Sequence, residues 1–267
     1  MQALKSTQWR LPVAEPDAAR QSLALELLDC LADPDPVLRD ELAFEALSSW
    51  MRGKALTVPT LQAIRRRLSA ILDGPADEAG FRQPFAALAL AEVARVDRLQ
   101  PFLSAPERAA LVAVAAAYLA AVRDYRGHDT QQGWRHGVAH GADLALQLSL
   151  NPALQREQAE TLLAAIASQV MPAGDHAYRY GEGERLMAPV FYLGRRAWWQ
   201  ADDWQRWFAA LSARRGPSQP ATPLTLARRH NLSLFLSALY VAVQENSDAD
   251  LKARLLPGLR KALTELG

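Results

Sequence analysis

Residues 33–47, DPDPVLRDELAFEAL, contain the end of one predicted helix and the start of the next. Proline is tolerated in the first turn of an α-helix but breaks its interior, so this Asp-Pro-Asp-Pro run separates a helix over 17–32 from one over 36–52. The apolar residues that follow have the spacing of one buried helical face: Leu42, Ala43, Ala46 and Leu47. The segment therefore looks like one helix of a HEAT-type repeat.

Similar start signals recur along the chain, and strand patterns are scarce because Ala and Leu dominate. Ser104 and Glu107 have the capping-box spacing, and Thr222 precedes a proline at another predicted start. The predicted helices cover 17–32, 36–52, 59–74, 82–97, 105–124, 133–150, 153–170, 184–199, 202–213, 223–245 and 248–264.

Successive predicted helices begin about 20–25 residues apart, so a helix pair occupies about 40–47 residues, which is the period of HEAT and armadillo repeats. The predicted fold class is all-α, an irregular HEAT/armadillo-like α-solenoid of about ten or eleven helices. The alternative is a compact helical bundle with the same number of helices. No shift in composition divides the chain, so we predict a single all-helical domain over 1–267, with an irregular N-terminal arm over 1–16.

The charges of the 267-residue chain nearly cancel, since 30 Lys and Arg face 29 Asp and Glu, for a net charge of +1. This balance does not favour nucleic acid or an anionic membrane as a partner. The one cysteine, Cys30, excludes an intrachain disulfide and a zinc site built on cysteines. Residues 1–16 lack the apolar core of a secretory signal, and the most apolar stretch, 109–122, is too short to span a bilayer. We therefore expect a cytoplasmic protein.

Residues 124–143, DYRGHDTQQGWRHGVAHGAD, contain three of the five histidines and form the candidate functional segment. If 133–150 is one helix, four polar side chains share a narrow stripe: His136, His140, Asp143 and Gln147. Three glycines form another row, which would let a backbone or a ligand come close: Gly133, Gly137 and Gly141. A solvated face would carry Lys, Glu and Arg instead, so the stripe marks a candidate site.

One interpretation of this stripe is a metal site. Two histidines at i and i+4 can bind one divalent metal ion, and Asp143 would be a third ligand beside His136 and His140. Glu182 or Glu184 would then act as the general base of catalysis, and Asp124 would assist. The glutamate of the H-E-x-x-H motif is absent, since Gly137 stands in its place. This interpretation predicts a metal-dependent hydrolase or another metalloenzyme.

Two other interpretations need no metal ion. In the first, Trp134, Arg126 and Gln147 bind a small ligand or a protein partner. In the second, the segment is a structural polar network, in which Asp124 and Arg126 form a buried ion pair that fixes the following loop.

Four of the seven tryptophans lie within ten residues of one another, at positions 198, 199, 204 and 207. An aromatic box for a ligand is one interpretation. However, four apolar residues of this region recur with the spacing of an amphipathic helix: Trp204, Trp207, Phe208 and Leu211. We therefore expect these side chains to pack in the core.

Several blocks of the chain resemble a bacterial family known as domain of unknown function 2785. The most distinctive are DYRG at 124–127 and GWRHGVAHGADL at 133–144; the others are FRQPFAALALAE at 81–92, ERL at 184–186 and LRDELAFEAL at 38–47. The resemblance implies an all-helical bacterial protein and implies no particular activity.

The sequence thus predicts an interaction or ligand-binding module with a polar His/Asp site near 133–150. The metalloenzyme is the alternative, and the sequence leaves the substrate, the partner and the oligomeric state open.

Overall fold

The computed structural model describes residues 17–216 and 220–266, so the predicted N-terminal arm lies outside the described residues. Nearly all the regular secondary structure of the described residues is helical, which confirms the all-α class. Its helices are α2 Asp17–Cys30, η1 Val37–Phe44 (a π-helix), α3 Glu45–Arg52, α4 Val58–Asp73, α5 Arg82–Leu99, α6 Ala105–Ala121, α7 Gly137–Leu150, α8 Arg156–Val170, α9 Glu182–Gly194, α10 Ala201–Ala213, α11 Pro223–Gln244 and α12 Ala249–Thr264; its strands are β1 His128–Asp129 and β2 Gly133–Trp134.

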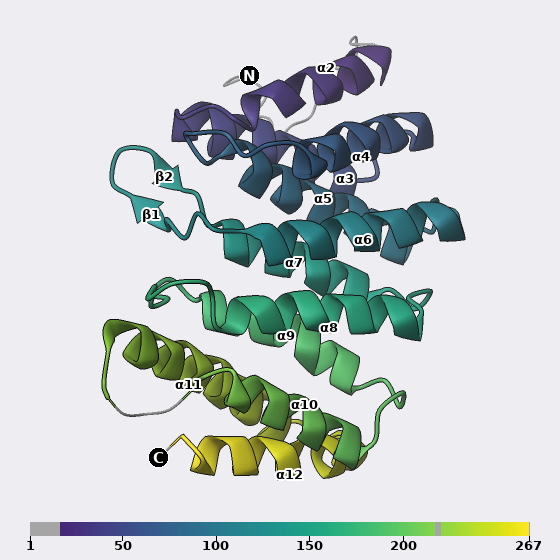
Figure 1. Cartoon of the computed structure of the whole chain (residues 1–267). Helices are drawn as coiled ribbons and strands as arrows, with labels where there is room; N and C mark the ends of the chain where they lie inside the picture. Colours follow the sequence, from purple (N-terminus) through teal and green to yellow (C-terminus); the bar gives the residue numbers. More distant parts are fainter. Residues whose placement is uncertain (1–16, 217–219, 267) are drawn as a thin grey trace.

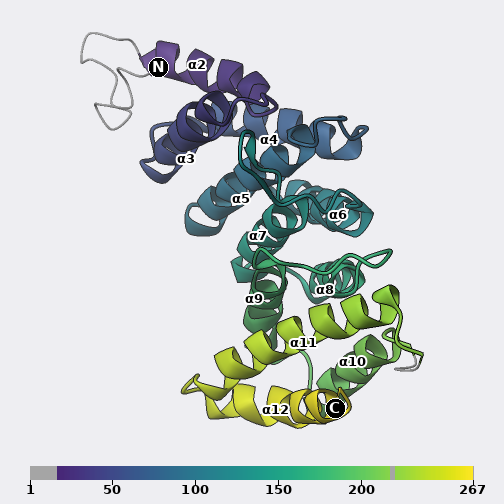
Figure 2. The same ribbon diagram turned by 90° about the vertical axis from the view of Figure 1, so that its left-hand side faces the viewer.

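The helices stack in layers from α2 at one end of the molecule to α12 at the other (Figure 1). Two rows are visible in Figure 2: α5, α7 and α9 pack on one another in the first, and α4, α6 and α8 in the second. At the C-terminal end α11 packs on α9, and α12 packs on both α10 and α11. HEAT and armadillo repeats stack in this layered order, and the assignment to that repeat class stays a prediction.

Several helices begin at capping residues that the sequence contains. The Ser104 hydroxyl accepts the Glu107 N–H while the Glu107 carboxylate accepts the Ser104 N–H, which forms the expected capping box. The Thr222 hydroxyl accepts the Thr225 N–H in the same way. One difference concerns the helix predicted over 36–52, which is two elements, the π-helix η1 followed by α3.

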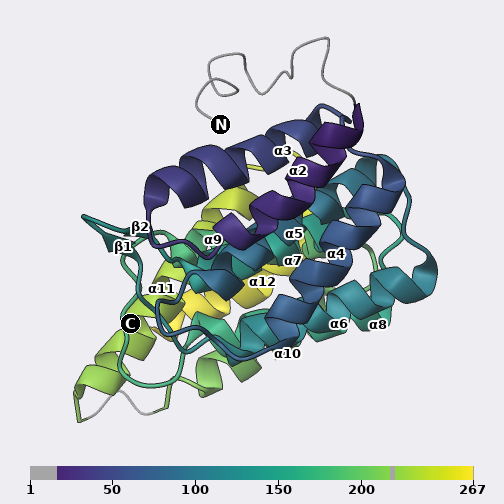
Figure 3. The same ribbon diagram turned by 90° about the horizontal axis from the view of Figure 1, so that it is seen from above.

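A larger difference is that residues 133–150 do not form one helix. The Asp129 carboxylate accepts the backbone N–H groups of Gln131 and Gln132, which forms a turn and pairs β1 with β2 in an antiparallel hairpin. Gly133 and His136 then adopt the left-handed conformation, with φ of 75° and 56°, so α7 begins only at Gly137. Seen from above, the hairpin lies at one edge of the stack (Figure 3).

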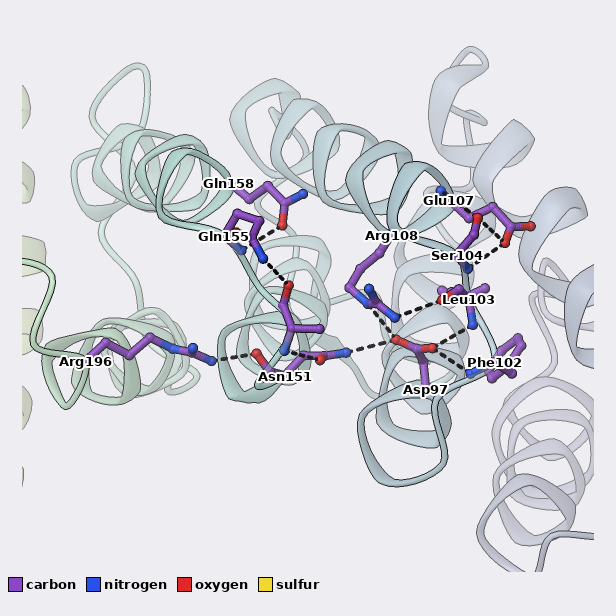
Figure 4. Close-up of polar contacts among 11 residues, drawn as sticks. Asp97, Phe102, Leu103, Ser104, Glu107, Arg108, Asn151, Gln155, Gln158 and Arg196 are labelled. Carbon is purple, nitrogen blue, oxygen red and sulfur yellow. Dashed lines mark hydrogen bonds and ion pairs between the residues drawn. The ribbon is translucent and has the colours of Figure 1, made fainter.

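The other end of α7 is held by a buried polar network around Asp97 (Figure 4). The Asp97 carboxylate accepts hydrogen bonds from the backbone of Phe102 and Leu103 and from the side chains of Arg108 and Asn151. The Asn151 carbonyl in turn accepts a hydrogen bond from Arg196, which follows α9. The network therefore ties the ends of α5, α7 and α9 together.

A helix must be both long and apolar to cross a membrane, and none of the described helices meets both conditions.

Candidate functional site

The segment 123–136, which carries the hairpin, lies beside the α8–α9 loop, residues 171–181. Together they form a groove of about 840 Å³. The side chains and glycine that line it are Arg123, Asp124, Tyr125, Arg126, Gly127, His128, Asp129, Arg135, His176, Arg179 and Tyr180. Its volume is in the range of small-molecule binding sites.

The groove is rich in positive charge, because its four arginines face two aspartates, Asp124 and Asp129. Arg179 is exposed and forms no ion pair with any residue in the described ranges. Arg123 donates to the backbone carbonyls of Ala120 and Val122, at 2.8 and 2.7 Å, rather than to a carboxylate. These two guanidinium groups leave the groove with uncompensated positive charge.

Asp124 and Arg126 form the ion pair that the sequence suggested, although both side chains remain partly exposed rather than buried. The Arg126 Nε lies 2.8 Å from Asp124 Oδ1, and Arg126 also donates to the Glu78 carbonyl at 3.1 Å. Burial raises the pKa of Asp124, but the hydrogen bonds from Arg126 outweigh it, so the pKa lies below its ordinary value. The pair therefore stays charged and joins the groove to the α4–α5 loop.

Two arginines, Arg39 and Arg135, anchor the hairpin by hydrogen bonds. The fully buried Arg39 donates to the Gln132 carbonyl at 2.7 Å, and Arg135 donates to the Gln132 side chain at 2.6 Å and to the Ala79 carbonyl at 2.8 Å. Both guanidinium groups lie over the Phe81 ring, at 4.0 and 4.4 Å from its centroid. The sequence did not predict that either arginine anchors the hairpin. The only signal for Arg39 is its place on a predicted helix with a buried apolar face.

An aromatic cluster covers one side of the groove. The Trp134 ring stacks on His136 with centroids 4.6 Å apart, and the edges of His128 and Tyr180 pack against Trp134. A Cβ on Gly127 would lie 2.0 Å from the Tyr180 ring, so the close approach of that ring requires glycine here. Trp134 and Tyr180 stay 38% and 42% exposed, which leaves both rings accessible to a ligand.

His136 lies beneath Trp134 and next to a buried carboxylate. Its side chain is 10% exposed, and its Nε2 has no hydrogen-bond partner among the described residues. The nearest carboxylate oxygen, Oε1 of Glu182, is 3.9 Å away, while the other oxygen accepts the Tyr180 N–H at 2.9 Å. Burial lowers the pKa of His136, and the Glu182 charge opposes this shift only in part. His136 also has a positive φ of 56°, which is a strained conformation for a residue other than glycine. Such strain is common at functional sites.

Asp143 and Gln147, two other residues of the predicted stripe, form hydrogen bonds with neighbouring helices. Both oxygens of Asp143 pair with Arg185 of α9, and the side-chain Oε1 of Gln147 accepts a hydrogen bond from Arg98 of α5 at 3.3 Å. Neither Asp143 nor Gln147 lines the groove. Of the glycine row, Gly137 and Gly141 contact side chains of α6, whereas Gly133 belongs to β2.

The metal interpretation does not fit this geometry. Within residues 17–216 and 220–266, no three His, Cys, Asp or Glu side chains are placed to hold one metal ion. His136, His140 and Asp143 were predicted as ligands on one helical stripe, but His136 precedes the helix and Asp143 is held by Arg185. Asp124 lies in the groove with Arg126, while Glu184 is exposed in the first turn of α9.

His140 is a buried histidine that stays neutral. It contacts the edge of Phe85, and its Nδ1 donates to the Pro84 carbonyl at 3.2 Å, an assignment that follows from the acceptor. Burial, together with the nearby His136, lowers the pKa of His140 to about 3. His140 therefore joins α7 to α5 as a neutral side chain.

This shift makes stability depend on pH. Because the pKa of His140 in the unfolded chain is near 6.5, the unfolded state binds more protons at any pH from 6.5 down to about 3. The stabilisation is thus complete above pH 6.5 and is lost as the pH falls, by about 1.4 kcal/mol per pH unit. We expect His140→Gln to reduce this slope in urea unfolding between pH 7 and 5. An unchanged slope in His140→Gln would contradict this assignment.

The fold and the geometry together define an all-α protein with a cationic, aromatic-rimmed groove. The model of a family described as protein of unknown function (DUF2785) matches residues 68–241, and the chain belongs to this family. The match confirms the resemblance found in the sequence and includes the hairpin, the α8–α9 loop and the groove. No curated protein and no solved structure matches the chain.

Proposed function

We propose that the protein is a ligand-binding module whose groove binds a small anion that carries a planar ring. The observation that carries this proposal is the set of four arginines and two histidines around a cavity of about 840 Å³ that contains only two carboxylates. Guanidinium groups bind carboxylate and phosphate through paired, charge-assisted hydrogen bonds. Arg179 supports this function most directly, because no carboxylate in the described part of the chain neutralises it.

The ring of the ligand is inferred from the aromatic side chains of the groove. Tyr125 of the hairpin segment stacks on His176 of the α8–α9 loop with centroids 5.1 Å apart, and Tyr180 of the same loop presents an exposed ring. Such faces bind planar groups by stacking. Among the ligand-binding residues suggested by the sequence, Arg126 lines the groove, Trp134 packs beside it, and Gln147 lies elsewhere.

Titration calorimetry with phenyl phosphate, inorganic phosphate and phenol tests this proposal. We expect phenyl phosphate to bind more tightly than inorganic phosphate, phenol not to bind, and added salt to weaken both anions. Arg179→Ala removes charge-assisted hydrogen bonds worth about 1.5–3 kcal/mol, so affinity falls about tenfold or more.

Arg66→Ala is the matched control, because Arg66 is also an exposed arginine but lies on α4 outside the groove. Equal affinities of wild type and Arg179→Ala for phenyl phosphate would contradict the proposal. An equal loss in Arg66→Ala would indicate that the anion binds nonspecifically.

The cytoplasmic location, the bacterial origin and the absence of a nucleic-acid or membrane partner stay predictions.

A further inference from the structure

A second cavity lies where the stacking of the helices is interrupted. In the row of α4, α6 and α8, each helix packs on the next, but α10 packs on α12 and makes only few contacts with α8. In Figure 1, α10 runs obliquely below α8. The space between these two helices is a cavity of about 550 Å³, which we call the tryptophan cavity.

Three indole rings form the wall of this cavity, which is also lined by Leu163 and Ala164 of α8. Trp199 and Trp207 each pack edge-to-face on Trp204, with ring centroids 5.6 and 5.9 Å away. Trp204 packs in the core as predicted, since it is only 1% exposed. It nevertheless lines the cavity. Aromatic walls at steep angles to one another present both ring faces and ring edges to a planar guest.

The rim of the cavity carries no net charge. Arg156 pairs with Glu160 at 3.0 Å, and Arg206 pairs with Asp203 at 2.6 Å, so each cation at the rim has its own carboxylate. This balance contrasts with the groove, where positive charge is in excess. A neutral guest would therefore enter without an electrostatic penalty, whereas an anion would gain nothing here.

One polar atom of this cluster has no hydrogen-bond partner. The Nε1–H of Trp204 is buried and has no acceptor among the described residues. Unpaired buried donors are uncommon in folded proteins and usually mark a missing partner. The volume also lies within the range of small-molecule sites, which are mostly apolar with few polar groups.

We propose that the tryptophan cavity is a second binding site, which takes a neutral, planar, largely apolar small molecule with a hydrogen-bond acceptor for the Trp204 Nε1–H. This site does not depend on the anion groove, because the two cavities share no lining residue. Its guest lies between α8 and α10 and fills the gap in the helical stack.

The test uses N-phenyl-1-naphthylamine, a neutral fluorescent probe that accepts energy from tryptophan. We expect saturable binding to wild type, with quenching of tryptophan emission. Ala164 is exposed on α8 and lines the cavity, so Ala164→Phe fills the space without removing a core side chain. This variant should bind the probe at least tenfold more weakly. Ala70→Phe, at an exposed position of α4, is the matched control and should bind like wild type.

Equal probe affinity in Ala164→Phe and wild type, or a signal that never saturates, would overturn the proposal. Phenyl phosphate titrated into Ala164→Phe separates the two sites, since its binding to the groove should not change. Loss of probe binding in both Ala164→Phe and Ala70→Phe would show a general effect of added apolar surface and would also overturn it.

Discussion

Asp97→Ala is expected to lower the free energy of unfolding by about 3–5 kcal/mol, because it leaves a buried cation without its partner. Arg108 Nε lies 2.9 Å from the Asp97 carboxylate, and both residues are buried. The same carboxylate accepts two backbone N–H groups and the Asn151 side chain, so all these donors lose their acceptor together (Figure 4). The loss loosens the junction of α5, α7 and α9.

Urea unfolding of purified wild type and Asp97→Ala measures this effect. Asp29→Ala is the control, since Asp29 also pairs with an arginine but is 79% exposed, and it should cost at most about 1 kcal/mol. Equal midpoints for the two variants would show that the Asp97 network contributes nothing to stability.

The Asp97 network should also respond to acid. Burial raises the pKa of Asp97, but hydrogen bonds from Arg108 and from the Leu103 and Phe102 backbone outweigh it, so the pKa is lowered. A carboxyl whose folded pKa lies below its unfolded value stabilises the protein above the unfolded pKa. This contribution is lost as the pH falls through the folded pKa, so wild type and Asp97→Ala should converge in stability at the acid end.

Arg39→Met is expected to have the second largest effect, about 3 kcal/mol, and to release the hairpin. Arg39 donates to the carbonyls of Asp33, Pro34 and Gln132 and pairs with Asp40, and its side chain is fully buried. Methionine keeps the apolar stem but leaves these acceptors unpaired. Since Gln132 lies in the turn of the hairpin, the change reaches the groove.

Amide hydrogen exchange distinguishes this role from a general loss of stability. The N–H groups of Arg135 and His136 donate to the carbonyls of Gly127 and Arg126, so they report on the closed hairpin. They should exchange faster in Arg39→Met under native conditions, while amides within α12 keep their rates. The exposed Arg67→Met, which also loses a pair with an aspartate, should change neither. Unchanged exchange at 135 and 136 would contradict the anchoring role of Arg39.

Most of the helical framework follows from local signals in the sequence. Capping residues such as Ser104 and Thr222 satisfy backbone groups of their own first turns, so three or four neighbouring residues suffice to predict a start. The hairpin could not be predicted this way. Its strands have two residues each, and Arg39 holds its turn from 93 positions away in the sequence.

The candidate site shows the same difference between local contacts, which the sequence predicts, and distant contacts, which it does not. Asp124 and Arg126 pair two residues apart, so their place in the groove follows from one short segment. Asp143 pairs with Arg185, 42 residues away, and this contact between helices removes it from the proposed ligand set. Arg179 and Tyr180 reach the groove from the α8–α9 loop, which no pattern in the sequence linked to the hairpin.

Fluorine NMR tests the binding groove most directly. The seven tryptophans are replaced by 5-fluorotryptophan, and the Trp134 resonance is assigned with Trp134→Phe. On titration with phenyl phosphate, we expect the Trp134 resonance to shift saturably and the resonances of Trp199 and Trp204 to stay in place. Arg179→Ala should need about tenfold more phenyl phosphate or more to reach the same shift. A Trp134 resonance that does not move, or that moves at the same ligand concentrations in Arg179→Ala, would contradict the proposal that the groove binds an anion.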